Sequence, residues 1–314
     1  MLEPIEGARQ GHANERLGNR VYHLLRKARV PWAYGIPIVS GIKTALHPID
    51  HVQRRWAAGK LNGSTFATKV PDSEGYWLFG PDHIPGSTQV AAECAMIFKK
   101  LQAGGRLEAR AGKKVFFRPV FTGDDFVEHP IIGSFAISTP VLEAVAGYFA
   151  SAPILTSICL FWSRPNNTAV SSQRFHIDGE NDRQLKLFLN VWEHDERHGP
   201  FTFYPASVTE KIVAKAPPHR QRMRGATSWT DEFIYEAATD AKIVRVTGEP
   251  GSGVFVDTSR CLHYGSRGNT HDRLMLMIQY APHNYARETS IPLGRADWIR
   301  LDDTNTLQRM ALGR

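Results

Sequence analysis

The sequence predicts a mainly β fold, a sandwich or barrel with helices packed outside it. Short segments rich in β-forming residues follow one another from Ile154 onward, and turn signals separate them. Helical patterns do not alternate with these segments, which argues against a parallel sheet built from β–α–β units. With 314 residues, 42% of them hydrophobic and 22% charged, the chain can bury a substantial core.

The expected helices lie before the strands. An amphipathic pattern predicts one around residues 14–29, followed by irregular chain up to about residue 70 because Pro and Gly recur there. A second helix is expected from Ser87, as its cap, to about Ala103, where a Gly-Gly pair ends it. A third is expected from Pro140 to about Phe149, with Thr139 as cap and the proline at the first helical position.

The expected strands share short length and β-forming composition: Leu155–Trp162, Gln184–Trp192, Phe201–Tyr204, Ala241–Thr247, Gly253–Val256 and Leu274–Tyr280. The stretch 207–240 interrupts them with a basic Pro-Pro segment and a short helical piece, Thr230–Ala237. Insertions of this length are commonly lids or binding loops. Gly199-Pro200 and Pro205-Ala206-Ser207 have the composition of turns that close a hairpin.

The net charge of +7 does not by itself indicate a nucleic-acid partner. Basic residues gather at 16–29 and at 211–224, and neither segment carries interleaved aromatic residues or a nucleic-acid-binding motif. We therefore expect no nucleic-acid partner. The segment 211–224 could instead receive the carboxylate, phosphate or carrier group of an anionic substrate.

The three cysteines, Cys94, Cys159 and Cys261, lie far apart and predict neither a disulfide framework nor a paired zinc motif. The first residues lack a secretory pattern, and no apolar stretch reaches the roughly 20 residues of a membrane-spanning helix. We expect a cytoplasmic protein. Contact of the N-terminal helix with an anionic membrane stays open, although its Gly, Asn and His content argues against it.

A possible metal site begins in the segment RFHIDGEND, where His176 and Asp178 lie two residues apart. In an extended strand such a pair projects from one face, so an imidazole and a carboxylate converge. A His-x-Asp tripeptide alone is also compatible with a turn that Asp178 caps, and a similar pair occurs at His47 and Asp50. A third ligand from elsewhere in the chain is needed to distinguish a metal site from a turn.

The preferred third ligand is His263, which we expect at the end of the strand that opens after the GEPGSG turn. His194 and His198 follow a strand too closely to return across a barrel, and His271 lies in a polar loop. Two histidines and one carboxylate on one face of an octahedron leave positions open for oxygen and a chelating co-substrate. This set is typical of oxygen-activating iron(II) enzymes.

Ten positions beyond His263, Arg273 opens the apolar strand RLMLMIQY. A guanidinium at that place can point into a barrel and bind a carboxylate in a bidentate manner. An arginine on the surface is the alternative, since buried arginines are rarely unpaired. The nearby histidines favour the inward position.

In order and local context these residues resemble the phytanoyl-CoA dioxygenase family of iron(II)/2-oxoglutarate oxygenases. The resemblance starts in FHIDGENDRQLKLFLNVWEHDERHGPFTFYPASV, continues through His263 and Arg273, and covers about residues 145–285. It implies a double-stranded β-helix, the jelly roll of cupin-like proteins. We accordingly divide the chain into an N-terminal extension, 1–70, and one oxygenase domain, 71–314, with a lid-like insertion at about 207–240.

The resemblance also implies roles for individual residues. His176, Asp178 and His263 would ligate Fe(II), and Arg273 would bind the distal carboxylate of 2-oxoglutarate. Lys186 shares a strand face with Phe188 and Asn190, which makes it a further candidate for contacting co-substrate or substrate; a lysine that extends to solvent from an edge strand is the alternative.

The implied reaction consumes O2 and 2-oxoglutarate, with ascorbate as a possible auxiliary reductant. It hydroxylates an unactivated C–H bond of a small molecule or of a lipid-like or carrier-bound substrate and releases succinate and CO2. Related halogenases lack the carboxylate ligand, so Asp178 argues against halogenation. Two alternatives stay open: a cupin-type metalloprotein of other activity, which would not need Arg273, and a catalytically silent jelly-roll binding module.

Overall fold

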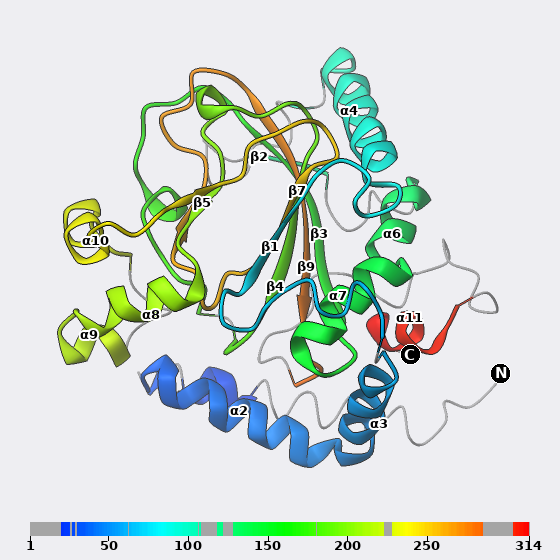
Figure 1. Ribbon diagram of the computed structural model, residues 1–314, viewed down its shortest axis with the longest axis vertical. Helices are drawn as coiled ribbons and strands as arrows, with labels where there is room; N and C mark the ends of the chain where they lie inside the picture. Colours follow the sequence, from blue (N-terminus) through cyan, green and yellow to red (C-terminus); the bar gives the residue numbers. More distant parts are fainter. Residues whose placement is uncertain are drawn as a thin grey trace.

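The computed structural model describes residues 20–25, 27–28, 30–61, 63–105, 107, 118–121, 128–179, 181–222, 228–284 and 304–313. Two antiparallel sheets form its centre, and helices cover them from outside (Figure 1). The prediction of a mainly β fold with flanking helices is therefore confirmed. The six expected strands all occur, although the ones expected at 201–204 and 241–247 are shortened to two residues each.

The strands form two antiparallel sheets. In spatial order the larger one contains β1 (Tyr76–Phe79), β7 (Gly253–Asp257), β4 (Leu185–Asn190), β9 (Arg273–Ala281), β3 (Ile154–Ser163) and β2 (Arg118–Phe121). The smaller one contains β6 (Val244–Arg245), β5 (Thr202–Phe203) and β8 (His263–Tyr264). From β4 to β9 the chain passes repeatedly between the two sheets, which gives the jelly-roll arrangement.

Side-chain alternation on β4 shows how the larger sheet separates two environments. Leu185, Leu187 and Leu189 belong to the core beneath the helices, whereas Phe188 belongs to a second core that also contains side chains of β5, β7 and β9. This second core therefore lies between the two sheets. Lys186, on the same face as Phe188, points into that interior.

The described helices are α2 (Trp32–Leu46), α3 (Pro48–Gly59), α4 (Ser87–Ala103), α6 (Pro130–Ala136), α7 (Thr139–Phe149), α8 (Ala206–Ala214), α9 (Pro218–Arg222), α10 (Asp231–Ala238) and α11 (Thr306–Ala311). Helices α3, α4, α6, α7 and α11 pack against the outer face of the larger sheet, α2 lies beside α3, and α8 to α10 lie beside the smaller sheet (Figure 1). One helical stretch, 130–149, has the length and composition of a membrane span, but 61% of its most apolar window is buried in the core.

The expectation of irregular chain before residue 70 is wrong, because α2 and α3 occupy most of that region. Ile36, Val39 and Lys43 are buried at helical spacing on α2, and this packing outweighs the helix-breaking effect of Pro37. On α3, buried Arg54 pairs with Asp50 at 2.9 Å and donates to three backbone carbonyls near β3 and α11. The division of the chain at residue 70 remains a prediction.

Other differences concern the ends of elements. Helix α4 begins at Ser87 as expected, but Gly86 is its N-cap, with φ 86°. Helix α7 begins at Thr139, after Ser138 as N-cap. Pro205 does not close a hairpin, because it precedes the first turn of α8. The helical piece expected at Thr230–Ala237 is α10, which begins one residue later, and Thr230 is its N-cap, accepting from the amide of Phe233.

Candidate metal centre and co-substrate site

His176 and His263 lie opposite each other on adjacent backbone segments. The amide of each donates to the carbonyl of the other, at 2.9 and 3.0 Å. Strand β7 ends at Asp257, so the expectation that His263 ends that strand is wrong; it begins the separate strand β8 of the smaller sheet. The amide of Asp178 donates to the carbonyl of Thr258 at 2.9 Å. This bond holds the segment that carries Asp178 against the turn that follows β7.

Three side chains converge at this point. One ligand atom from each of His176, Asp178 and His263 lies within 4.8 Å of the other two. The Nε2 atom of His176 is 3.7 Å from Oδ1 of Asp178, and Nε2 of His263 is 3.9 Å from Oδ2. The structure therefore brings the three predicted ligands together.

Backbone carbonyls orient both imidazoles. Nδ1 of His176 lies 2.8 Å from the carbonyl oxygen of Arg174, and Nδ1 of His263 lies 2.8 Å from that of Cys261. Only a protonated Nδ1 can donate to a carbonyl, so the Nε2 atoms carry the lone pairs that face Asp178. Burial is the main cause that lowers the pKa of His263 to about 3, and it keeps this imidazole neutral, as metal binding requires.

Asp178 is held ionised by the charges around it. Its partial burial opposes ionisation, but the Lys186 ammonium, 2.7 Å from Oδ2, holds its pKa well below the usual range. Strand β4 is central in the larger sheet, so the alternative of a lysine extending from an edge strand is wrong. In this structure Lys186 contacts the proposed metal-ligating carboxylate.

Gln184 is a functional candidate that the sequence analysis missed. Its Nε2 donates to Oδ2 of Asp178 at 3.0 Å and to Oγ1 of Thr258 at 2.9 Å. Gln279 donates to its Oε1 at 3.1 Å, which fixes the orientation of the amide. The alternation in QLKL could have revealed it, because Gln184 is two residues before Lys186 and extended chain places both on one face.

Arg273 is buried, with 2% of its surface exposed. Nη1 donates to the carbonyl of Gly199 at 3.0 Å and Nη2 approaches Oγ of Ser163 at 3.5 Å, whereas Nε has no partner. Burial lowers the pKa of Arg273 to about 10. Within the described ranges no carboxylate pairs with this guanidinium, an unusual situation for a buried cation.

A short segment connects Arg273 with the metal centre. The Phe201 ring lies 5.3 Å from the His263 ring and 4.4 Å from the Phe188 ring, between centroids. Gly199, two residues earlier, has φ 60°, and a Cβ there would come within 2.9 Å of Asn269. Glycine therefore allows the backbone to turn its carbonyl toward Arg273. The cation and the three ligands face the same apolar interior.

The other described histidines are not part of this cluster. His194 is buried and hydrogen-bonds Oδ1 of Asn190, His198 pairs with Asp195 at 2.7 Å, and His271 is exposed. Next to the similar pair of His47 and Asp50, Nδ1 of His51 lies 3.1 Å from Nε2 of His283. Among the residues that the structure describes, only the triad at 176, 178 and 263 forms a metal-ligand group of three.

Comparison with known proteins gives distant structural neighbours. No family model and no curated protein sequence matches the chain. The epimerase SnoN in complex with Fe3+, α-ketoglutarate and nogalamycin RO aligns with 15% identity over 80% of this chain and 92% of its own, at a TM-score of 0.45. EctD from S. alaskensis with 2-oxoglutarate and 5-hydroxyectoine aligns with 14% identity over 70% and 76%, at 0.48.

A third neighbour, AviO1 from Streptomyces viridochromogenes Tue57, aligns with 15% identity over 72% of this chain and 97% of its own, at a TM-score of 0.46. Similarities of this size do not assign a reaction. The side chains of the site have to carry the functional conclusion.

Proposed function

We propose that the protein is an iron(II)- and 2-oxoglutarate-dependent oxygenase that hydroxylates a C–H bond of a small-molecule, lipid-like or carrier-bound substrate. The convergence of two imidazoles and one carboxylate carries the proposal, because this donor set suits iron(II) and leaves coordination positions open. Bound iron with 2-oxoglutarate and O2 supplies the oxidation: one oxygen atom enters the substrate, the other enters succinate, and CO2 leaves.

The chain supplies position and charge. His176, Asp178 and His263 would hold the metal, and the two carbonyl-bound Nδ1–H groups keep the imidazoles in the metal-binding tautomer. Arg273 would bind the distal carboxylate of 2-oxoglutarate, which explains why a buried guanidinium lies in the interior with no carboxylate partner among the described residues. Phe188 and Phe201 keep the space between Arg273 and the three metal ligands apolar.

Release of succinate tests the proposal. The purified protein is supplied with iron(II), ascorbate, 2-oxoglutarate and a panel of candidate substrates, and succinate is quantified with and without O2. We expect conversion that requires both O2 and iron. Metal binding with no conversion of 2-oxoglutarate on any substrate would instead favour a cupin-type protein of other activity or a silent binding module.

The substrate itself we propose to be anionic, on the basis of the basic segment 211–224 alone. Within it, Arg220 lies over the Trp229 ring at 5.5 Å and donates to the carbonyl of Ser228; the side chain of Arg222 and residues 223–227 lie outside the described part. Replacing Arg220, Arg222 and Arg224 by Ser should raise the KM for a carboxylate or phosphate substrate. An unchanged KM rejects an anionic substrate bound there.

A further inference from the structure

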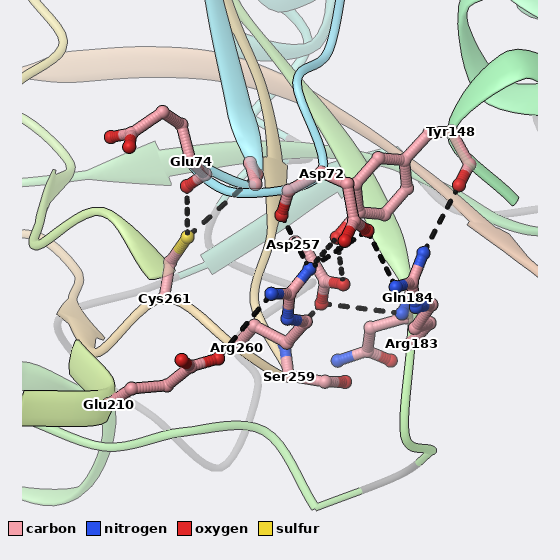
Figure 2. A network of polar contacts seen from close by, with 11 residues as sticks. Asp72, Glu74, Tyr148, Arg183, Gln184, Glu210, Asp257, Ser259, Arg260 and Cys261 are labelled. Atoms are coloured by element: carbon pink, nitrogen blue, oxygen red, sulfur yellow. Dashed lines mark hydrogen bonds and ion pairs between the residues drawn. The ribbon is translucent and has the colours of Figure 1, made fainter. Parts of the chain in front are cut away.

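Asp257 is a buried acid at the end of β7, on the helix side of the larger sheet. Its Oδ2 accepts a 2.6 Å hydrogen bond from the Tyr148 hydroxyl of α7. Its Oδ1 accepts from the amide of Ser259 at 2.9 Å and from that of Gln184 at 3.5 Å. A single carboxylate therefore binds three segments that are far apart in the sequence (Figure 2).

Two of these segments lead to the metal ligands. Gln184 uses its side chain to hold Asp178, and Thr258, the residue after Asp257, accepts the Asp178 amide through its carbonyl. The turn that follows Asp257 leads directly into His263. Because the carboxylate binds the backbone of both segments, its position affects the spacing between Asp178 and His263.

Arg260 supplies the opposite charge from the solvent side. Nη1 donates to the Tyr148 hydroxyl at 3.1 Å and to the carbonyl of Asp72 at 2.8 Å, and Nη2 approaches Glu210 on α8 at 3.4 Å. Tyr148 therefore accepts from Arg260 and donates to Asp257, so its hydroxyl is fully used. The network reaches from the loop before β1, through α7 and β7, to the first helix of the 207–240 insertion (Figure 2).

An acid at this place is costly for the fold. Burial raises the pKa of Asp257 to about 6, although the Tyr148, Ser259 and Gln184 hydrogen bonds and the Arg260 charge act in the opposite direction. A neutral side chain would avoid this penalty. A function of this carboxylate therefore has to compensate for the penalty. The hydrogen bonds to both segments that carry the metal ligands indicate that this function is to position them.

We propose that Asp257 and Tyr148 are positioning residues for the metal centre: the hydrogen-bonded pair sets the separation of Asp178 and His263 from behind the sheet. This inference rests on the metal site of the proposed function. It differs from a purely structural role because it predicts a loss of metal affinity that is not explained by a loss of stability.

The experiment compares Tyr148→Phe with Tyr280→Phe. The Tyr280 hydroxyl is also buried on the helix side of the larger sheet and donates at 2.6 Å, but to the carbonyl of Ala136, away from the ligand segments. Each variant loses one buried hydroxyl, so both should lower the unfolding temperature similarly. Cobalt(II), added to metal-depleted full-length protein, serves as the probe, and its visible absorption bands report both affinity and ligand geometry.

We expect Tyr148→Phe and Asp257→Asn to weaken cobalt(II) binding by about tenfold or more, as substitutions behind metal ligands commonly do. Their absorption bands should also shift. Tyr280→Phe should keep the affinity within about twofold of the parent protein, despite its loss of stability.

The outcomes separate the two proposals. If the parent protein shows no cobalt(II) binding that His176→Ala abolishes, the metal site fails and the positioning role fails with it. If the parent binds cobalt(II) and Tyr148→Phe retains the affinity and bands of Tyr280→Phe, only the positioning role is overturned.

Discussion

Buried charge is compensated differently at the two ends of the barrel interior. At the metal centre, Asp178 is surrounded by Lys186, Gln184 and two imidazoles, so the chain itself balances the carboxylate. At the other end, Arg273 carries a positive charge that no described carboxylate meets. On the proposed function, the first end has its charges paired before any ligand binds, whereas the carboxylate of 2-oxoglutarate would complete the second end.

Replacing His176 by Ala should have the largest effect on activity, because it removes a ligand from the metal end. The imidazole is partly exposed, so folding should be little affected, while the metal loses one of its three protein ligands. We expect succinate formation to fall on the order of a thousandfold, about 4 kcal/mol in the barrier. Circular dichroism checks the fold, and activity close to the parent level would contradict the ligand role.

Replacing Arg273 by Met tests the second end in two ways. The KM for 2-oxoglutarate should rise about 100-fold, because the distal carboxylate loses a buried charge partner. The protein without co-substrate should become more stable, by roughly 1 to 3 kcal/mol, because an unpaired buried cation is removed.

Arg54 provides the matched control for Arg273. It is equally buried, but it is paired with Asp50 and three carbonyls, so Arg54→Met should destabilise the protein. Urea unfolding of both variants gives the comparison. If Arg273→Met is destabilised as much as Arg54→Met, the charge at position 273 is already satisfied by the chain.

Replacing Lys186 by Met tests the charge pairing of Asp178 at the metal end. Asp178 loses its closest cation, so the metal-free protein should lose about 2 kcal/mol of stability. A divalent ion can supply the missing charge, so the difference from the parent should shrink when metal is added. Thermal unfolding with and without manganese(II) measures both values, and a deficit that metal leaves unchanged would show that Lys186 acts independently of the metal.

The smallest effect is expected from His194, whose burial and proximity to the Arg273 charge lower its pKa to about 3. A folded-state pKa below the unfolded value of about 6.5 contributes stability that is present above pH 6.5 and is lost as the pH falls. His194→Asn should therefore reduce the loss of stability between pH 6.5 and 5.5 by about 1 kcal/mol.

The exposed His271, replaced in the same way, is the control for this pH dependence. Urea midpoints at several pH values give the slopes. Identical slopes for the parent protein and His194→Asn would mean that burial of His194 does not contribute to acid sensitivity.

Local sequence pattern explains which parts of the molecule could be predicted. His176 and Asp178 were recognisable because two residues on extended chain share a face, and Arg273 because a charge opens an otherwise apolar strand. The mainly β fold followed from the strands after Ile154. Such signals lie within a few residues of one another, so no knowledge of tertiary contacts is needed.

The missed features depend on distant contacts. The Gly and Pro residues of α2 indicated irregular chain, but the burial of Ile36 and Val39 stabilises a helix there. The short strand β1 pairs with β7, more than half of the chain length away in sequence, and no local turn signal predicts this pairing. The bond between Tyr148 and Asp257 likewise joins residues whose local sequences give no indication of each other.

The paired amides of His176 and His263 have a consequence for how the site can open. Each histidine is joined to the other through its main chain, so the two backbone segments cannot separate at this point unless two hydrogen bonds break together. Deuterium uptake at these two amides should therefore follow a single opening event. A molecule that enters the interior therefore needs other segments to move, because the two histidine segments stay joined.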